Sequence, residues 1–210
     1  MLSAALGEAG RASLSRRLRR QWFRRGDVVF NEGDRGDCLY VVESGRFGVQ
    51  LSGSDGHAVT LRIVHPGDWF GELALVHFDH RRTGRVCALE DGTSLLLTRA
   101  EFDKLRVEHP GFDRFLVSLL AERLISADRM VVELLESAEK RVWHSLEMLA
   151  DEYGDDPIRM SQDMLAQTAG TVRQTANRVL QIGVRDGVLS LSRNQIRILD
   201  RAALGELLAR

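Results

Sequence analysis

The sequence predicts an α+β protein made of an N-terminal antiparallel β-barrel or sandwich, one long helix, and a small helical unit with a β-hairpin. Between residues 26 and 98, short runs rich in Val, Leu, Ile and Phe alternate with glycine-containing breaks, which is typical of antiparallel strands. From 112 to 138 an apolar pattern with helical spacing runs without glycine or proline. After Pro157, two short helical patterns precede two short apolar runs.

Composition limits the function classes. The 210 residues are 28% charged and 44% hydrophobic, with a net charge of −1, so the whole chain does not favour a polyanion. No apolar run approaches the roughly 18 residues of a membrane span, and no export signal follows Met1. We expect a cytoplasmic protein without a membrane partner, in which Cys38 and Cys87 are reduced, buried thiols.

We expect the chain to divide into residues 1–110, 111–138 and 139–210. In the first part, apolar residues at helical spacing through residues 2–23 predict one or two short helices. Their arginine cluster is interpreted as a solvated helix face. It consists of Arg16, Arg17, Arg19, Arg20, Arg24 and Arg25.

Short strands follow, separated by turn residues. Asp55-Gly56 and Asp91-Gly92 are hairpin signals, because glycine tolerates a positive φ. Gly33, Gly45 and Gly67 are expected at similarly tight corners. The strands are expected at 27–30, 38–43, 46–51, 59–64, 69–70, 85–89 and 94–98.

The stretch Gly71-Glu72-Leu73 and the pair Arg82-Thr83 carry the chemistry of this domain. Glycine followed by glutamate offers free backbone N–H groups beside a carboxylate, and arginine with a hydroxyl supplies a phosphate clamp. Together these groups could hold a small phosphorylated sugar by both its ends.

The long helix carries an apolar seam. Its residues alternate in spacings of three and four, which is typical of a helix that pairs with another helix. A second apolar stripe beside it includes Phe112 and Phe115, so one face would pack on the barrel and the other on a second subunit. The seam comprises Val117, Leu120, Leu124, Ala127, Val131, Leu134 and Ala138.

Residues 162–180 fit a helix-turn-helix, and a further helix is expected at 139–152. Ala166 is small where two helices would cross, and Gly170 stands where the turn needs a left-handed residue. The second helix projects side chains suited to base edges in a major groove, arginine for guanine and Asn or Gln for adenine. The residues at this surface are Thr171, Arg173, Gln174, Asn177 and Arg178.

Residues 189–191 and 196–198 are interpreted as a β-hairpin wing beside that helix. From Arg159 onward arginines outnumber acidic residues, which permits nucleic-acid binding. The alternative is a winged helix that contacts proteins.

Barrel, clamp, seam helix and winged helix-turn-helix, in this order, resemble the family of the cyclic-AMP receptor protein and the fumarate–nitrate regulator, bacterial transcription factors. The resemblance covers nearly the whole chain and implies a β-roll (a jelly roll) as the N-terminal fold. Besides the helix-turn-helix, it rests on Gly26-Asp27, Glu32-Gly33-Asp34, Leu39-Tyr40-Val41-Val42, Ser44-Gly45, Pro66-Gly67-Asp68, Gly71-Glu72-Leu73 and Arg82-Thr83.

The resemblance implies roles for the clamp. In members that bind cyclic nucleotides, the residue matching Glu72 accepts the ribose 2′-hydroxyl. Those matching Arg82 and Thr83 hold the cyclic phosphate, close to the amide of the residue matching Gly71. Arg123 matches an arginine that faces the pocket. Val49, Leu61 and Val64 match positions that line the base.

The chain departs from the family at Ala127-Asp128. Cyclic-AMP binders commonly place a Thr-Ser pair there against the adenine. Alanine has no polar side-chain group, whereas an ionised aspartate only accepts hydrogen bonds, from the adenine amino group or the guanine edge. Cyclic AMP is therefore the first candidate effector and cyclic GMP the second.

The resemblance implies a homodimeric regulator, controlled by cyclic nucleotide, that binds a palindromic DNA site and works with RNA polymerase. The alternative is a constitutive DNA binder with a vestigial or different effector pocket. No catalytic residue or metal site is predicted. An iron–sulfur sensor needs about four placed cysteines, and the histidines lack the spacing of a cupin-type metal enzyme. A haem sensor could use His77 or His80.

Overall fold

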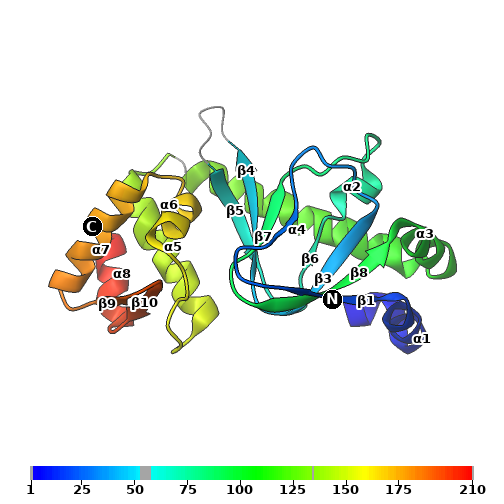
Figure 1. Ribbon diagram of the computed structural model, residues 1–210, viewed down its shortest axis with the longest axis horizontal. Coiled ribbons are helices and arrows are strands. Elements are labelled where there is room, and N and C mark those ends of the chain that lie inside the picture. Colours follow the sequence, from blue (N-terminus) through cyan, green and yellow to red (C-terminus); the bar gives the residue numbers. More distant parts are fainter. Residues whose placement is uncertain (1, 53–57, 134, 210) are drawn as a thin grey trace. The chain divides into compact units, whose positions relative to one another are not determined.

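A computed structural model describes residues 2–52, 58–133 and 135–209. The chain forms two compact units, one of Met1–Val49 with Ile63–Met130 and one of Gln50–Arg62 with Val131–Arg210. Figure 1 shows the strand-rich N-terminal part, the long helix α4 (Gly111–Glu133) and the helical C-terminal part. The predicted α+β fold class is confirmed.

The first segment is a helix followed by a strand. Helix α1 (Leu2–Arg17) confirms a helix here, but the helical prediction beyond Arg17 is wrong, because residues 19–23 form strand β1 (Arg19–Phe23). This strand pairs antiparallel with β8 (Gly92–Thr98). Its Phe23 packs edge-to-face on Phe47, while Trp22 is 78% exposed. The arginine cluster is therefore spread over a helix, a strand and a turn.

Two four-stranded sheets form the β-rich domain, in the orders β1-β8-β3-β6 and β2-β7-β4-β5. All seven predicted strands are present. They are β2 (Val28–Phe30), β3 (Cys38–Ser44), β4 (Phe47–Ser52), β5 (Ala58–Val64), β6 (Trp69–Phe70), β7 (Arg85–Ala88) and β8.

Strand β3 divides the core, because successive side chains of a strand point to opposite faces. Leu39 belongs to an apolar cluster that includes Phe102 and Phe112 from the helices that follow β8. Tyr40 belongs to a second cluster, where it stacks on Phe70 at 5.0 Å between ring centroids. The sheet thus has helices on one face and the other sheet's side chains on the opposite face.

The tight turns predicted at three glycines are confirmed, but one predicted hairpin turn is not. Gly33, Gly45 and Gly67 have positive φ. Asp91-Gly92 was predicted to be a hairpin turn, and this is wrong, because β7 and β8 lie in different sheets. A Cβ at Gly92 would lie 2.5 Å from the carbonyl oxygen of Ser44, so glycine permits a close chain crossing there. The predicted turn Asp55-Gly56 lies outside the described residues.

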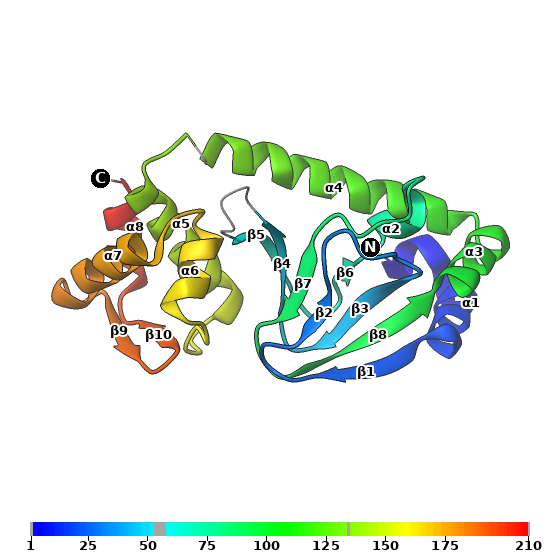
Figure 2. The same cartoon turned by 45° about the horizontal axis from the view of Figure 1, so that its top comes forward.

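Helices α1 and α3 (Arg99–Glu108) lie side by side at one end of β8 (Figure 2). Helix α4 follows and ends at Glu133, so the prediction of one helix through residue 138 is wrong at its end. The Ser137 side chain accepts a hydrogen bond from the Lys140 N–H and caps the next helix, α5 (Ala138–Tyr153). Ala138 therefore lies on α5, and Leu134 lies outside the described residues.

The C-terminal unit is a winged helix-turn-helix. Helices α6 (Gln162–Thr168) and α7 (Arg173–Arg185) follow α5, and α8 (Arg201–Ala209) ends the chain. Strands β9 (Leu189–Ser192) and β10 (Gln195–Ile198) pair antiparallel, which confirms the predicted wing. Leu165, Ala176 and Val179 are fully buried between the helices.

Candidate functional site

The residues of the predicted clamp lie at the two ends of one segment, residues 71–83, named here the ligand loop. Gly71 follows β6 with φ +80°, a conformation that glycine adopts without strain. Glu72 comes next, and the short helix α2 (Leu73–Val76) begins directly after it. The loop ends at Arg82-Thr83, just before β7.

Arg82 is buried, with 5% of its surface exposed. Its Nη1 donates to the carbonyl oxygens of Cys38 at 2.8 Å and Gly71 at 2.9 Å. Its Nη2 lies 3.2 Å from the Cys38 sulfur, and the guanidinium lies 4.1 Å from the centre of the Phe30 ring. The structure therefore fixes this cation close to Gly71, as the clamp prediction requires.

The same guanidinium has N–H groups that these contacts do not use. Its buried Nε has no hydrogen-bond partner among the described residues, and the Nη2 group has a second hydrogen beyond the one directed at sulfur. These two N–H groups share one edge of the guanidinium, the geometry that binds two phosphate oxygens. A buried cation with an unpaired donor fits a phosphate ligand.

Glu72 and Arg123 form a buried ion pair. Glu72 is 1% exposed, and its Oε1 lies 2.8 Å from Nε of Arg123 on α4. Arg123 also donates to the carbonyl oxygen of Trp69. A buried charge needs a partner, so this contact joins the ligand loop to α4 and explains why Arg123 lies at the predicted pocket.

The other predicted ligand residues differ in how far they are buried. Val49 packs against the core between the sheets, and Leu73 is half-buried. Leu61 on β5 is 41% exposed. The structure leaves three further predicted residues exposed, namely Thr83, Ala127 and Asp128.

A turn at residues 33–36 packs against the ligand loop. Gly36 donates its N–H to the carbonyl oxygen of His80 at 2.8 Å. A Cβ at Gly36 would lie 2.2 Å from Cβ of Ala74 and 3.1 Å from Nε of Arg82. Only glycine lets this turn approach the loop and the arginine so closely.

We expect Gly36→Ala to lower the free energy of unfolding by about 1–3 kcal/mol, because the new methyl group meets Ala74, which cannot move aside. Chemical denaturation measures this change. Gly205→Ala is the matched control, since a Cβ there meets open space and alanine favours the helix. Equal stability of the wild-type and Gly36→Ala proteins would contradict the expected clash.

The cysteines are free and buried, as predicted. Cys38 lies between Arg82 and Tyr40 and contributes both its carbonyl oxygen and its sulfur to Arg82. Burial raises the pKa of the Tyr40 phenol, and its hydrogen bond with the Cys38 side chain adds to the rise. Tyr40 therefore remains a neutral phenol beside the cation.

The predicted seam of α4 faces solvent in the isolated chain. Val117, Leu124 and Val131 are 67%, 65% and 62% exposed. Leu120 is half-buried. Ile125 and Val132, absent from the prediction, are also exposed and widen the apolar face. Phe112 and Phe115 are buried against the β-rich domain, as predicted.

The DNA-reading surface predicted on α7 is exposed at Arg173, Gln174, Asn177 and Arg178, and Thr171 is half-buried. Gly170 has φ +55°, which confirms the left-handed turn between the helices. Arg173 lies 3.3 Å from Asp163 of α6, and Arg178 lies 3.8 Å from Glu139 of α5. Such exposed pairs are weak, so both arginines remain available to a ligand.

Sequence reasoning missed Arg141, which fixes the helix-turn-helix turn. Its Nε and Nη2 donate to the carbonyl oxygens of Ala169 and Gly170, both at 2.9 Å, and Nη1 donates to that of Glu136 at 2.7 Å. One side chain thus joins the segment before α5 to the turn before α7. No local spacing signals this role, since the turn lies 28 and 29 residues away.

Within the described ranges, no helix has the length and apolar character needed to cross a membrane. The same residues contain no group of three or more His, Cys, Asp or Glu side chains that could hold a metal ion.

Comparison with known families defines the class of protein. Residues 20–109 match the cyclic nucleotide-binding domain, and residues 140–207 match the Crp-like helix-turn-helix domain. A ligand-binding β-roll followed by a DNA-binding head is the organisation of a transcription regulator.

Relatives identify the family. The chain is 32% identical to the cyclic AMP receptor protein of Thermus thermophilus, over 90% of this chain and 88% of that one. It is 29% identical to a CRP-like cAMP-activated global transcriptional regulator of Mycobacterium tuberculosis, over 92% and 89%. The solved structure of the c-di-GMP-responsive global regulator CLP of Xanthomonas campestris shares the fold, with a TM-score of 0.79 and 20% identity over 91% and 99%. The chain belongs to the family of the cyclic-AMP receptor protein and the fumarate–nitrate regulator.

Proposed function

We propose that this protein is a homodimeric, sequence-specific DNA-binding regulator whose DNA affinity is set by a cyclic nucleotide, with cyclic AMP as the first candidate. The observation that carries the ligand half is the buried Arg82, whose Nη1 donates to Gly71 and whose Nε–H has no hydrogen-bond partner among the described residues. Such a group suits the cyclic phosphate. The buried carboxylate of Glu72, on the same loop, suits the ribose 2′-hydroxyl.

The relatives support cyclic AMP over other effectors, because two of them are described by their response to it. Titration calorimetry of the purified protein with cyclic AMP and with cyclic GMP tests this half of the proposal. Binding of cyclic AMP at micromolar concentration is expected. No heat with either nucleotide at millimolar concentration would show that the pocket has another ligand or none.

Dimerisation is proposed from the exposed apolar face of α4. A parallel pair of such helices would bury Val117, Leu124 and Val131, which the isolated chain leaves in water. The dyad would present two α7 helices to successive major grooves, about 34 Å apart. We therefore expect a palindromic DNA site, and RNA polymerase as the partner at promoters.

Replacing Arg173 by alanine should weaken binding by about 1–3 kcal/mol at one base pair of each half-site, because arginine reads guanine through two hydrogen bonds. Sites selected from a random DNA pool give the half-site, and anisotropy titrations with each base substituted in turn measure the loss. Arg193→Ala, on the wing turn, is the control. A loss that is uniform over all sequences would assign Arg173 to a phosphate instead.

A second candidate is a constitutive DNA binder of the same family. The observation that favours it is Ala127-Asp128, exposed on α4 without the polar pair that cyclic-AMP binders commonly use. Binding to a selected site with equal affinity with and without cyclic AMP would support this candidate. A clear gain on adding nucleotide would exclude it.

A further inference from the structure

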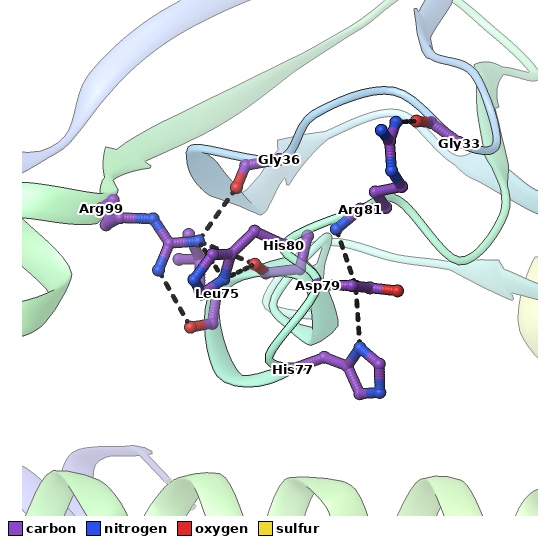
Figure 3. Close-up of polar contacts among 9 residues, drawn as sticks. Gly33, Gly36, Leu75, His77, Asp79, His80, Arg81 and Arg99 are labelled. Carbon is purple, nitrogen blue, oxygen red and sulfur yellow. Dashed lines mark hydrogen bonds and ion pairs between the residues drawn. The ribbon is translucent and has the colours of Figure 1, made fainter.

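Arg99, the first residue of α3, makes contacts that the clamp residues do not explain. Its Nη2 donates to the carbonyl oxygens of Ala74 at 2.8 Å and Gly36 at 3.1 Å, and its Nη1 donates to that of Leu75 at 3.2 Å. Its backbone N–H donates to the carbonyl oxygen of Asp37. Figure 3 shows the guanidinium directed at Gly36, Leu75 and His80. One residue therefore joins the ligand loop, the 33–36 turn and α3.

The carbonyls that Arg99 holds belong to the groups around Arg82. Ala74 and Leu75 lie in α2, the short helix that begins directly after Glu72. Gly36 lies so close to Arg82 that a methyl group there would be 3.1 Å from its Nε. The position of Gly36 relative to α2 therefore sets the space beside the unpaired Nε–H. Arg99 holds both sides of that space with one rigid, planar group.

His80 completes the arrangement. Its backbone has φ +56°, a left-handed conformation that is costly for a residue other than glycine. Its Nδ1 lies 3.1 Å from Nη2 of Arg99 and 3.3 Å from the carbonyl oxygen of Ala74, which Arg99 also holds. Its carbonyl oxygen accepts the N–H of Gly36. The strained residue is thus held by the same arginine and the same turn.

We infer that Arg99 is a positioning residue for the effector: it fixes the ligand loop and the 33–36 turn in the spacing that lets Arg82 and Glu72 bind a cyclic nucleotide. This inference rests on the proposed function. Arg99 itself does not touch the ligand, because its terminal nitrogens are directed at carbonyl oxygens and an imidazole.

The test is calorimetric titration of cyclic AMP into the full-length wild-type, Arg99→Gln and Arg99→Lys proteins. Glutamine cannot reach three carbonyls at once, so we expect the Kd of Arg99→Gln to rise at least about tenfold. Lysine keeps the charge and can satisfy some of the carbonyls, so its Kd should lie between the two. Arg106→Gln is the matched control on α3, because within the described residues the Arg106 side chain bonds to Asp113 and lies over the Phe102 ring, away from the ligand loop. Its Kd should match wild type.

Thermal unfolding separates positioning from simple support of the fold. If the affinity of each Arg99 variant falls only in proportion to its unfolded fraction at the assay temperature, or if Arg99→Gln binds within twofold of wild type, the inference is overturned. Rescue by lysine in a folded protein supports it. Absence of nucleotide binding by the wild type would instead refute the proposed function, which keeps the two failures distinguishable.

Discussion

Replacement of Arg82 by glutamine is expected to weaken cyclic AMP binding more than about 100-fold. A hydrogen bond to a charged group contributes about 1.5–3 kcal/mol, and the variant would lose the two that the free edge of the guanidinium can offer to a phosphate. Calorimetry measures the effect. Arg82→Lys should bind with intermediate affinity, because an ammonium keeps the charge but not the fork.

An arginine outside the ligand loop and the 33–36 turn provides the matched control for this prediction. Arg106 on α3 donates to Asp113 at 2.6 Å, so Arg106→Gln should retain the wild-type affinity. The Arg82 variants should also unfold more easily, because the carbonyl oxygens of Cys38 and Gly71 lose their donor. Binding by Arg82→Gln within threefold of wild type would remove Arg82 from the ligand site.

Replacing Leu124 by glutamate is expected to convert the protein to a monomer and to weaken binding to a palindromic site about 100-fold or more. Leu124 is 65% exposed in the isolated chain and lies in the middle of the apolar face of α4. A glutamate there would bring two carboxylates together in an apolar seam. Loss of the second DNA-binding head removes the gain that comes from linking two half-site contacts.

Sedimentation velocity gives the oligomeric state, and anisotropy titration gives the DNA affinity. Arg129→Glu introduces the same side chain five residues later, about 140° around the helix, and should remain dimeric. Binding to a single half-site should be nearly unchanged in Leu124→Glu, because its α7 surface is intact. A Leu124→Glu protein that remains dimeric would place the interface on another surface.

Local sequence patterns predicted most of the fold. The strands from β2 to β8 are marked by apolar runs between glycines, and Gly170 marks the turn of the helix-turn-helix, because these signals reside in a few adjacent residues. Strand β1 was missed for a related reason. Its Trp22 continues the helical spacing of Leu14 and Leu18, and only pairing with β8, about 70 residues later, makes the segment a strand.

The contacts that hold the candidate sites in place could not be predicted in this way. Arg99 reaches Gly36, which precedes it by 63 residues, and Arg141 reaches Gly170, which follows it by 29. Each arginine binds backbone carbonyl groups. Because every residue has one, the residue types do not indicate which carbonyl group an arginine binds. The end of α4 was missed because apolar spacing continues through residues 134–138, while the capping hydroxyl of Ser137 starts a new helix.

The ion pair between Glu72 and Arg123 could be predicted only in part from the sequence. Family resemblance assigned Arg123 to the pocket, and the structure adds its contact with Glu72 at 2.8 Å and the burial of the Glu72 carboxylate. Because Arg123 lies on the helix that carries the exposed apolar face, the proposed effector site and the proposed dimer face share one element. A ligand changes DNA affinity only by binding one arrangement of the DNA-binding heads more tightly than another.

The affinity for DNA with and without cyclic AMP tests the central claim most directly. A duplex selected from a random pool in the presence of cyclic AMP would be titrated by fluorescence anisotropy at fixed salt, since salt alone shifts such affinities. We expect cyclic AMP to tighten binding by about 5- to 150-fold, the usual range of allosteric coupling. Equal affinities in both titrations, by a protein that calorimetry shows to bind cyclic AMP, would contradict control of DNA binding by the nucleotide.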